Sequence, residues 1–263
     1  MILDRITPFR KVLEHLSSVV WLLVETVQET LEHMRRGRLP FRASIFFEQT
    51  DRAGVGSIPL IALVSLFLGL TMALLTGYQL QSFGTERLVP GLVAVGFTRE
   101  LGPLITGIMV AARIGAAYTA ELGTMTVAEE VEAIEAMGIG PLRFLVSPRV
   151  LAIFLLMPCL VVLSNLTAMV GAAFICNLKL GIAYPYFIDL VHDALQRRDI
   201  IAGVVKSFLF GLIIGLVACY KGLTVRGGAA GVGDATTSSV VTAITTVIGF
   251  DTLANIVLIA LYD

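Results

Sequence analysis

The chain alternates between long apolar stretches and short polar connections. The segment 53–85 runs for 33 residues without a charged side chain, and the segment 150–178 does so for 29. Each exceeds the roughly 20 residues that a helix needs to cross about 30 Å of hydrocarbon. Three further stretches carry only one or two charges each. The pattern predicts five transmembrane helices, near 57–78, 89–113, 148–174, 201–220 and 238–261.

The residues ahead of the first span follow a different pattern. Apolar residues recur every three or four positions from Leu13 to Leu31, the spacing of one helix face, and four arginines follow between positions 35 and 42. Such a helix lies in the membrane interface rather than across it. We therefore expect two units: residues 1–45, an amphipathic interfacial helix with a basic linker, and residues 46–263, an all-α domain of five transmembrane helices.

Composition supports a membrane protein. Hydrophobic residues make up 56% of the 263 positions and charged residues only 15%, whereas about 25% is charged in soluble domains. A soluble domain of this size has no interior that could hold so many apolar residues. An ordinary cytosolic enzyme, a disordered chain and a small disulfide-stabilised scaffold are excluded.

Candidate chemistry within the chain is sparse. The 19 basic and 20 acidic residues nearly cancel, so no overall basic surface points to nucleic acid. The three cysteines and three histidines are scattered, and we expect no metal site. The sequence has no GxxxxGK[ST], GxSxG or HExxH motif. We therefore expect no catalytic residue and no cofactor in this chain, and any nucleotide hydrolysis must come from another one.

Small residues recur every four positions on three of the predicted spans. Such stripes let helix backbones approach closely in lipid, so they predict a compact bundle. The pattern leaves open whether the contacts lie within one protomer or between two. The stripes are Ser65, Gly69, Ala73 and Gly77; Gly107, Ala111 and Gly115; and Gly211 with Gly215.

The connection between the second and third spans is acidic. We predict a short amphipathic helix there, within about 121–137, with Thr126 and Glu129 as a capping box and with Val127, Val131 and Ile134 as its apolar face. It is either a solvated loop helix or a docking helix for a soluble partner. Its acidic residues are Glu121, Glu129, Glu130, Glu132 and Glu135. A second amphipathic helix is expected over 184–199, with Ile188, Val191 and Leu195 on its apolar face.

Several ordered motifs resemble the MlaE (YrbE-type) permease family, over roughly residues 45–262. The matching segments are 97–103 (FTRELGP), 111–117 (AARIGAA), 120–125 (AELGTM), 130–138 (EVEAIEAMG), 147–152 (SPRVLA) and 231–237 (GVGDATT).

The resemblance implies the permease subunit of an ABC-type lipid transporter in the bacterial inner membrane. Such permeases are homodimers that bind a cytoplasmic ATPase dimer, which holds the ATP and Mg²⁺, and a periplasmic ring of MCE-domain lipid-binding subunits. The acidic helix would be the coupling helix that docks on the ATPase, and the cargo a phospholipid. Import of sterols or fatty acids, or a non-transport membrane scaffold, remain alternatives. The distribution of Lys and Arg predicts a cytoplasmic N-terminus and a periplasmic C-terminus.

Three ionisable residues stand near the middle of predicted spans: Arg99, Glu100 and Asp251. Ionisable groups are costly in hydrocarbon unless they are paired or hydrated. Adjacent residues point about 100° apart on an α-helix, so we expect Arg99 to pair across helices, with Asp251 or with Glu100 of another helix. Pro103 lacks an N–H and should leave the carbonyl of residue 99 free.

Two interpretations of these charges stay open. They either form ion pairs that only fix helix register, or they line a lipid-binding or gating cavity. For the lipid tails, the first span offers apolar residues at helical spacing, for which a lipid-facing surface is the alternative. These candidates are Leu70, Leu74, Leu75 and Tyr78.

Overall fold

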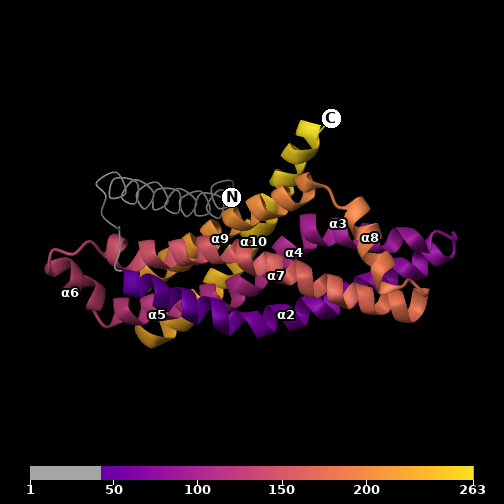
Figure 1. Cartoon of the computed structure of the whole chain (residues 1–263). Helices are drawn as coiled ribbons and strands as arrows, with labels where there is room; N and C mark the ends of the chain where they lie inside the picture. The colour runs from indigo at the N-terminus through magenta and orange to yellow at the C-terminus, as the bar shows by residue number, and fades with distance from the viewer. Residues whose placement is uncertain (1–42, 263) are drawn as a thin grey trace, which may run out of the picture.

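The protein is an elongated bundle of helices (Figure 1). The computed structural model describes residues 43–262, and these contain no strand. Five of their segments are long and apolar enough to span a membrane, namely 54–81, 86–127, 142–180, 197–223 and 228–257. The five predicted spans are therefore confirmed, while the predicted interfacial helix lies almost entirely outside the described residues.

The helices follow the chain in a simple order. The first span is α2 (Ala43–Gln81), and the second is built from α3 (Val89–Gly96), α4 (Gly102–Val110) and α5 (Ala116–Val127). The short α6 (Glu130–Ala136) follows, then α7 (Ser147–Leu180), α8 (Tyr184–Ala194), α9 (Arg197–Leu223) and α10 (Gly228–Tyr262). Figure 1 shows α6 at one end of the bundle and α3 with α8 towards the other.

A short 3-10 helix, η2 (Glu86–Leu88), precedes α3. Among the described residues, three π-helical turns interrupt the α-helices: η3 (Phe97–Leu101), η4 (Ala111–Gly115) and η5 (Leu142–Val146). Two of them lie within the second span. Each widens the backbone by one residue per turn and so changes the direction in which the following side chains point. Turns of this kind are frequent at functional sites, and η3 carries both Arg99 and Glu100.

Local sequence explains where several helices begin. Proline stands in the first turn of α3, α4, α7 and α8, a position that suits it because its fixed φ is already that of a helix. At the start of α9, Gln196 and Asp199 form a capping box. Helix α7 ends at Leu180 and is followed by Gly181, whose φ of 66° is in the left-handed region that glycine adopts without strain.

The small-residue stripe of α2 packs against α7 of the same chain. The hydroxyls of Ser65 and Ser164 are hydrogen-bonded at 2.7 Å in this interface, and both are buried. A methyl group added at Gly69 would collide with the main chain of Ala168, and one added at Gly171 with that of Leu66. The stripe therefore makes contacts within a protomer, which the sequence had left open.

Helix α9 occupies the centre of the bundle. It packs against α7, α10 and α5, and its small residues Gly211 and Gly215 lie against Ile153 and Val150 of α7. On another side, the Thr119 hydroxyl of α5 links α9 and α10 by hydrogen bonds: it lies 3.1 Å from the carbonyl oxygen of Ala218 and 2.8 Å from the Ser239 hydroxyl.

The helix predicted over 184–199 is two helices. Helix α8 ends at Ala194, and Asp199 belongs to the first turn of α9. Of the predicted apolar face, Val191 packs against the cluster formed by α2, α3 and α7, whereas Ile188 is 65% exposed; Phe187, which was not assigned to that face, is 4% exposed and packs there too. The chain turns at 195–196, which the amphipathic spacing did not reveal.

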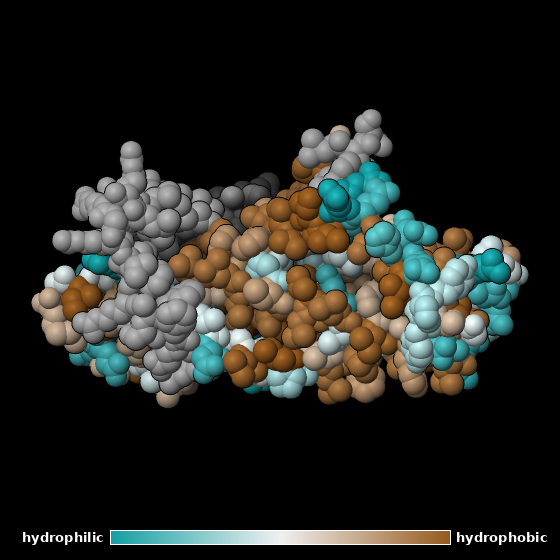
Figure 2. Space-filling model, viewed as in Figure 1, coloured by the Kyte–Doolittle hydropathy of each residue, from teal (hydrophilic) through white to brown (hydrophobic). Residues whose placement is uncertain are grey.

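Large apolar side chains cover the outside of the bundle. Figure 2 shows hydrophobic residues over its middle and hydrophilic ones gathered at the end formed by α3 and α8. Exposed apolar residues occur on α2, α7 and α10, including Phe67, Leu166 and Leu253. An apolar surface between polar ends is typical of a protein that lies in a bilayer.

Candidate functional site

A lysine lies at the centre of the charged groups within the bundle. The side chain of Lys206 on α9 is 2% exposed, and its Nζ lies 2.8 Å from Oε2 of Glu100 and 3.0 Å from Oδ1 of Asp251. It also donates a hydrogen bond to Oδ1 of Asn255 at 2.6 Å. One cation therefore joins three segments, η3, α9 and α10, and we call these four residues the Lys206 cluster.

The amide of Asn255 completes the cluster. Its Nδ2 donates to Oε2 of Glu100 at 2.9 Å and lies 3.5 Å from Oδ2 of Asp251, one turn earlier on α10. The amide thus donates to the carboxylates while it accepts from the ammonium group of Lys206. Because a buried charge is tolerated only when it is paired and hydrogen-bonded, this arrangement explains how a lysine can lie within an apolar bundle.

Proline chemistry brings the main chain into the same cluster. Pro103 cannot donate to the carbonyl four residues earlier, which is that of Arg99. Lys206 Nζ lies 3.4 Å from this carbonyl oxygen. The predicted free carbonyl therefore finds a donor on another helix. Close approach is possible because Gly203 packs directly against the carbonyl of Thr98, where a methyl group would collide.

The guanidinium of Arg99 lies at the edge of the cluster rather than within it. Its Nε is 3.7 Å from Oε1 of Glu100, and its NH1 is 3.9 Å from Oδ1 of Asp199. Asp199 is itself fixed, because its Oδ2 accepts a hydrogen bond from the backbone N–H of Gln196 at the start of α9. The Arg99 and Glu100 side chains are 28% and 33% exposed. The cluster thus has a closed side at Lys206 and an open side at Arg99.

These contacts correct the predicted pairing. Arg99 does reach another helix, but its partner there is Asp199 and not Asp251. The argument that Arg99 and Glu100 must diverge is also wrong, because they lie on a π-helical turn and both have long side chains. Lys206 was missed as a candidate, although it lies inside the predicted span 201–220. A signal existed, since Asp199, Gly203, Lys206 and Phe210 recur every three or four positions on one helix face.

The four apolar candidates on α2 are separated from this cluster within the chain. Helix α2 packs mainly against α7 and α3, whereas the Lys206 cluster joins η3, α9 and α10. Leu70 packs against the apolar cluster between α2, α3, α7 and α8. Leu74, Leu75 and Tyr78 are 43%, 57% and 80% exposed. These three side chains therefore lie on the outer surface of the protomer.

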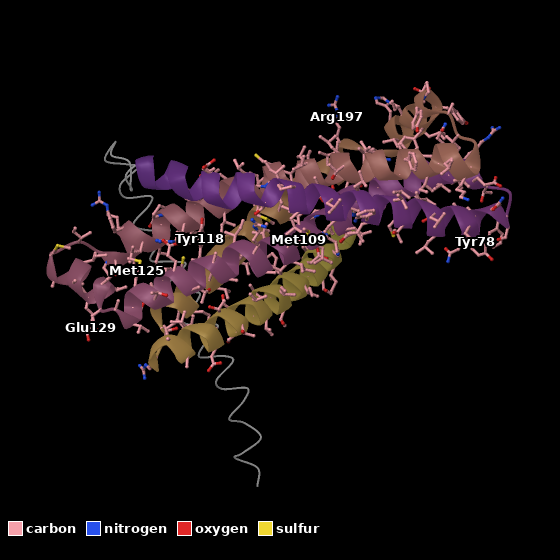
Figure 3. All side chains as sticks on the ribbon, turned by 90° about the horizontal axis from the view of Figure 1, so that it is seen from below. Tyr78, Met109, Tyr118, Met125, Glu129 and Arg197 are labelled. Carbon is pink, nitrogen blue, oxygen red and sulfur yellow. The ribbon has the colours of Figure 1, made fainter. Side chains whose placement is uncertain are left out.

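The acidic helix α6 lies at the end of the bundle opposite Tyr78, as the labelled Glu129 in Figure 3 shows. Four of the five predicted acids, Glu129, Glu130, Glu132 and Glu135, are on or directly before α6 and are exposed. No residue of α6 is buried. Val131 and Ile134 pack against an apolar cluster that includes Leu122 and Leu145. The opposite side of α6, which carries the acidic residues, is exposed.

The predicted cap of this helix is wrong. Thr126 is inside α5, which continues to Val127, and its hydroxyl donates to the carbonyls of Leu122 and Gly222. Helix α6 instead follows Glu129, whose φ of 59° is in the left-handed region and whose side chain makes no capping hydrogen bond. The second span, predicted to end near residue 113, continues as α5 packed against α9 to Val127, so the chain reverses at residues 128–129.

Glu121 is separated from the other predicted acids. It lies on α5, and its Oε1 is 2.7 Å from NH2 of Arg149 near the start of α7. The Arg149 side chain is 4% exposed, whereas that of Glu121 is 40% exposed. Glu121 therefore neutralises a buried arginine, and the outward-facing acidic surface consists of the other four residues.

Comparisons with known proteins agree with this architecture. The family model for permease MlaE matches residues 46–257. A chloroplast protein of Arabidopsis thaliana named TRIGALACTOSYLDIACYLGLYCEROL 1 is 36% identical over 206 residues, which are 78% of this chain and 58% of that protein. A probable ABC transporter permease protein of Rickettsia felis is 37% identical over 204 residues, which are 78% of this chain and 79% of that protein. One of Synechocystis is 34% identical over 212 residues, which are 81% of this chain and 80% of that protein.

The matched region contains all five spans, the Lys206 cluster and the acidic helix α6. Only the segment before residue 46 and the last few residues lie outside it. With a family model covering most of its length and relatives above 30% identity over more than two thirds of it, the chain belongs to the MlaE permease family.

Proposed function

We propose that this protein is the permease subunit of an ABC-type transporter that moves a lipid, most simply a phospholipid, between the inner and outer membranes of a bacterium. The observation that carries the proposal is the Lys206 cluster, which places ionised groups inside an apolar bundle and leaves Arg99 and Glu100 about one third exposed. A lipid is the cargo that needs both a polar contact for its headgroup and an apolar surface for its tails.

The relatives support a lipid cargo. One is named after trigalactosyldiacylglycerol, a lipid with a sugar headgroup, and others are named as probable ABC transporter permeases. In this chain, a phosphate or other acidic headgroup would contact Arg99, the one cation of the cluster region that is partly exposed. The tails would lie along the exposed face of α2 that includes Leu74, Leu75 and Tyr78, and a second protomer would bring this face opposite the charged groups.

The proposed energy source is a partner ATPase. A permease of the ABC type works with a nucleotide-binding subunit, and the exposed acids of α6 offer a charged surface with which a basic groove on that subunit can pair. In the proposed assembly two copies of this chain bind two ATPase subunits on the cytoplasmic side and an MCE-domain ring on the periplasmic side. The N-terminus is cytoplasmic and the C-terminus periplasmic.

Two alternatives, import of another lipid class and a scaffold without transport, make different demands on the charged groups. Import of a sterol, which has no anionic headgroup, would give Arg99 little to bind, whereas a fatty acid would present a carboxylate to Arg99 in place of a phosphate. A membrane scaffold without transport would need the charged groups only for helix register. The two alternatives differ from the proposal in what lipid is retained and in whether ATP drives its movement.

The experiment is reconstitution of the complete complex in proteoliposomes with a phospholipid that carries a fluorescent acyl chain. We expect ATP to drive transfer of the probe to acceptor membranes, and a non-hydrolysable ATP analogue not to. Mass spectrometry of lipid that co-purifies with the complex should identify phospholipid above the detergent-exchanged background. Retention of sterol or fatty acid in place of phospholipid would contradict the proposal, and so would the absence of ATP-dependent transfer of the fluorescent phospholipid.

A further inference from the structure

A second buried charge lies near the α6 end of the bundle, apart from the Lys206 cluster. The guanidinium of Arg149 donates from NH2 to Oε1 of Glu121 at 2.7 Å and from NH1 to the carbonyl of Leu145, also at 2.7 Å. It lies 5.8 Å from the centre of the Tyr118 ring, a distance at which a cation is attracted to an aromatic face. Figure 3 places Tyr118 between Met109 in the middle of the bundle and Met125 near α6.

The position of this pair in the chain is informative. Glu121 and Arg149 flank the segment 122–148, which contains α6 and η5. The rest of this segment contacts the bundle through apolar residues such as Val131, Ile134 and Leu142, and through the Thr126 hydroxyl, which donates to the carbonyl of Gly222. The ion pair therefore closes the base of the segment and ties the end of α5 to the start of α7. A movement of α6 can therefore reach both flanking spans, α5 and α7, through this base.

From the base, polar contacts continue into the helices that carry the Lys206 cluster. Thr119 follows Tyr118 directly and is hydrogen-bonded to the carbonyl of Ala218 on α9 and to Ser239 on α10. Helix α5 is continuous through η4 and α4 with the turn that bears Glu100, α9 bears Lys206, and α10 bears Asp251. The second span, α9 and α10 therefore contact one another at two places, once around Thr119 and once around Lys206.

We propose that the Glu121–Arg149 pair is a positioning device that transmits the movement of α6 to the spans, so that ATP hydrolysis on a partner is coupled to rearrangement around Lys206. The inference rests on the proposed function, since it assumes that an ATPase binds α6. Arginine suits this role, because its planar guanidinium holds a carboxylate and a carbonyl at once and keeps its charge when buried. Contact alone does not demonstrate coupling, so the test measures coupling directly.

The test uses the complete complex with Glu121→Gln and, separately, Arg149→Lys. Glutamine keeps the shape of Glu121 and an acceptor oxygen but removes its charge. Lysine keeps the charge of Arg149 but lacks the planar guanidinium that binds the Glu121 carboxylate and the Leu145 carbonyl at once. Glutamine still offers an acceptor oxygen to the buried Arg149, and Glu121 is itself 40% exposed, so the variant is expected to fold, with a lower unfolding temperature than the wild type. Asp234→Asn is the matched control: Asp234 is an exposed acid at the α6 end of α10 that is outside the pair.

We expect both variants to assemble with the ATPase and to hydrolyse ATP as the wild type does. The phospholipid probe moved per ATP should fall by about tenfold, within the range that coupling between two sites usually spans. Asp234→Asn should match the wild type. An unchanged ratio of transport to hydrolysis would overturn the proposal, as would a parallel fall of both activities in proportion to the amount of assembled complex, which indicates a structural role only.

A second measurement separates this inference from the choice of cargo. Spin labels at Leu166→Cys on α7 and Leu253→Cys on α10, both exposed positions, report the spacing of the spans. Cys159, which is also exposed, is replaced by serine. Nucleotide should change the label-to-label distance in the wild-type background but not with Glu121→Gln. An equal change in both overturns the coupling role, even if the complex proves to carry no phospholipid.

Discussion

The side-chain nitrogen of Lys206 lies 3.4 Å from the main-chain carbonyl oxygen of Arg99. This contact connects a defect in one helix with a charge on another. Pro103 removes the N–H that would otherwise bond this carbonyl, and the buried lysine provides a replacement donor. The π-helical turn at Phe97–Leu101 and the ammonium group of Lys206 thus stabilise each other, and neither is expected to persist unchanged without the other.

The first prediction concerns the proline. In Pro103→Ala the new N–H competes with Lys206 for the Arg99 carbonyl, so the turn should become α-helical and Glu100 should rotate away from Lys206. We expect stability to be kept, since alanine favours a helix interior over proline by about 3 kcal/mol, while lipid transport falls. Hydrogen exchange at residues 103–104 and the transport assay measure the two effects.

Pro90→Ala serves as the control, because Pro90 is in the first turn of α3, where its missing N–H needs no acceptor. Equal transport by Pro103→Ala and the wild type would show that the turn has no role in transport.

The second prediction separates stability from transport at the Lys206 cluster. Lys206→Met leaves Glu100 and Asp251 without their cation, so we expect the free energy of unfolding to fall by about 3–5 kcal/mol, as when one partner of a buried ion pair is removed. The triple variant with Glu100→Gln and Asp251→Asn has no charge left to compensate and should regain most of the stability. Thermal unfolding in detergent measures both.

Transport decides what the cluster is for. We expect no recovery of lipid transport in the triple variant, although it folds. If transport returns together with stability, the charges serve only to fix the register of the helices.

The third prediction concerns Arg99, whose contacts to Glu100 and Asp199 are 3.7 and 3.9 Å long. Because partly exposed pairs of this kind contribute about 1 kcal/mol or less, Arg99→Ala should assemble and melt almost as the wild type. Transport of a phospholipid should nevertheless fall by on the order of tenfold, equivalent to about 1.4 kcal/mol. A loss of folded protein that matches the loss of transport would assign Arg99 a structural role.

The fourth prediction contrasts two glycines. Gly69→Ala should destabilise the protein by about 1–3 kcal/mol, as overpacking does, because its new methyl group meets the main chain of Ala168 on α7. Gly96→Ala has no atom within 4 Å of the added group and should instead gain up to about 1 kcal/mol from helix propensity. Chemical or thermal unfolding in detergent shows whether the two changes have opposite signs.

The fifth prediction tests the surface of α6. Charge reversal by Glu130→Lys with Glu132→Lys should abolish co-purification of the ATPase. It should leave the unfolding temperature of the isolated permease unchanged, since no residue of α6 is buried. Asp193→Lys, on the exposed side of α8, gives the same kind of charge change at the other end and should leave the complex intact. Retention of the ATPase by the α6 variant would show that docking does not depend on these acids.

Patterns that depend on local sequence were predicted well. The five spans, the close packing of the small-residue stripe on α2 and the carbonyl freed by Pro103 all follow from residues near one another in the chain. The errors share a different cause. Thr126 is not a cap because α5, packed against α9, continues past it to Val127, and the helix predicted over 184–199 is divided because the chain turns at residues 195–196.

The sequence by itself determined that the chain lies in a bilayer and crosses it five times, since hydropathy is summed over contiguous residues and lipid excludes unpaired charge. Only the tertiary structure decided which charges meet. Whether Lys206 faces Glu100 and Asp251 depends on the rotation and depth of α9, and these are set by distant contacts such as Gly203 against Thr98 and Gly211 against Ile153. Pairing across helices is a property of that packing, which no single segment encodes.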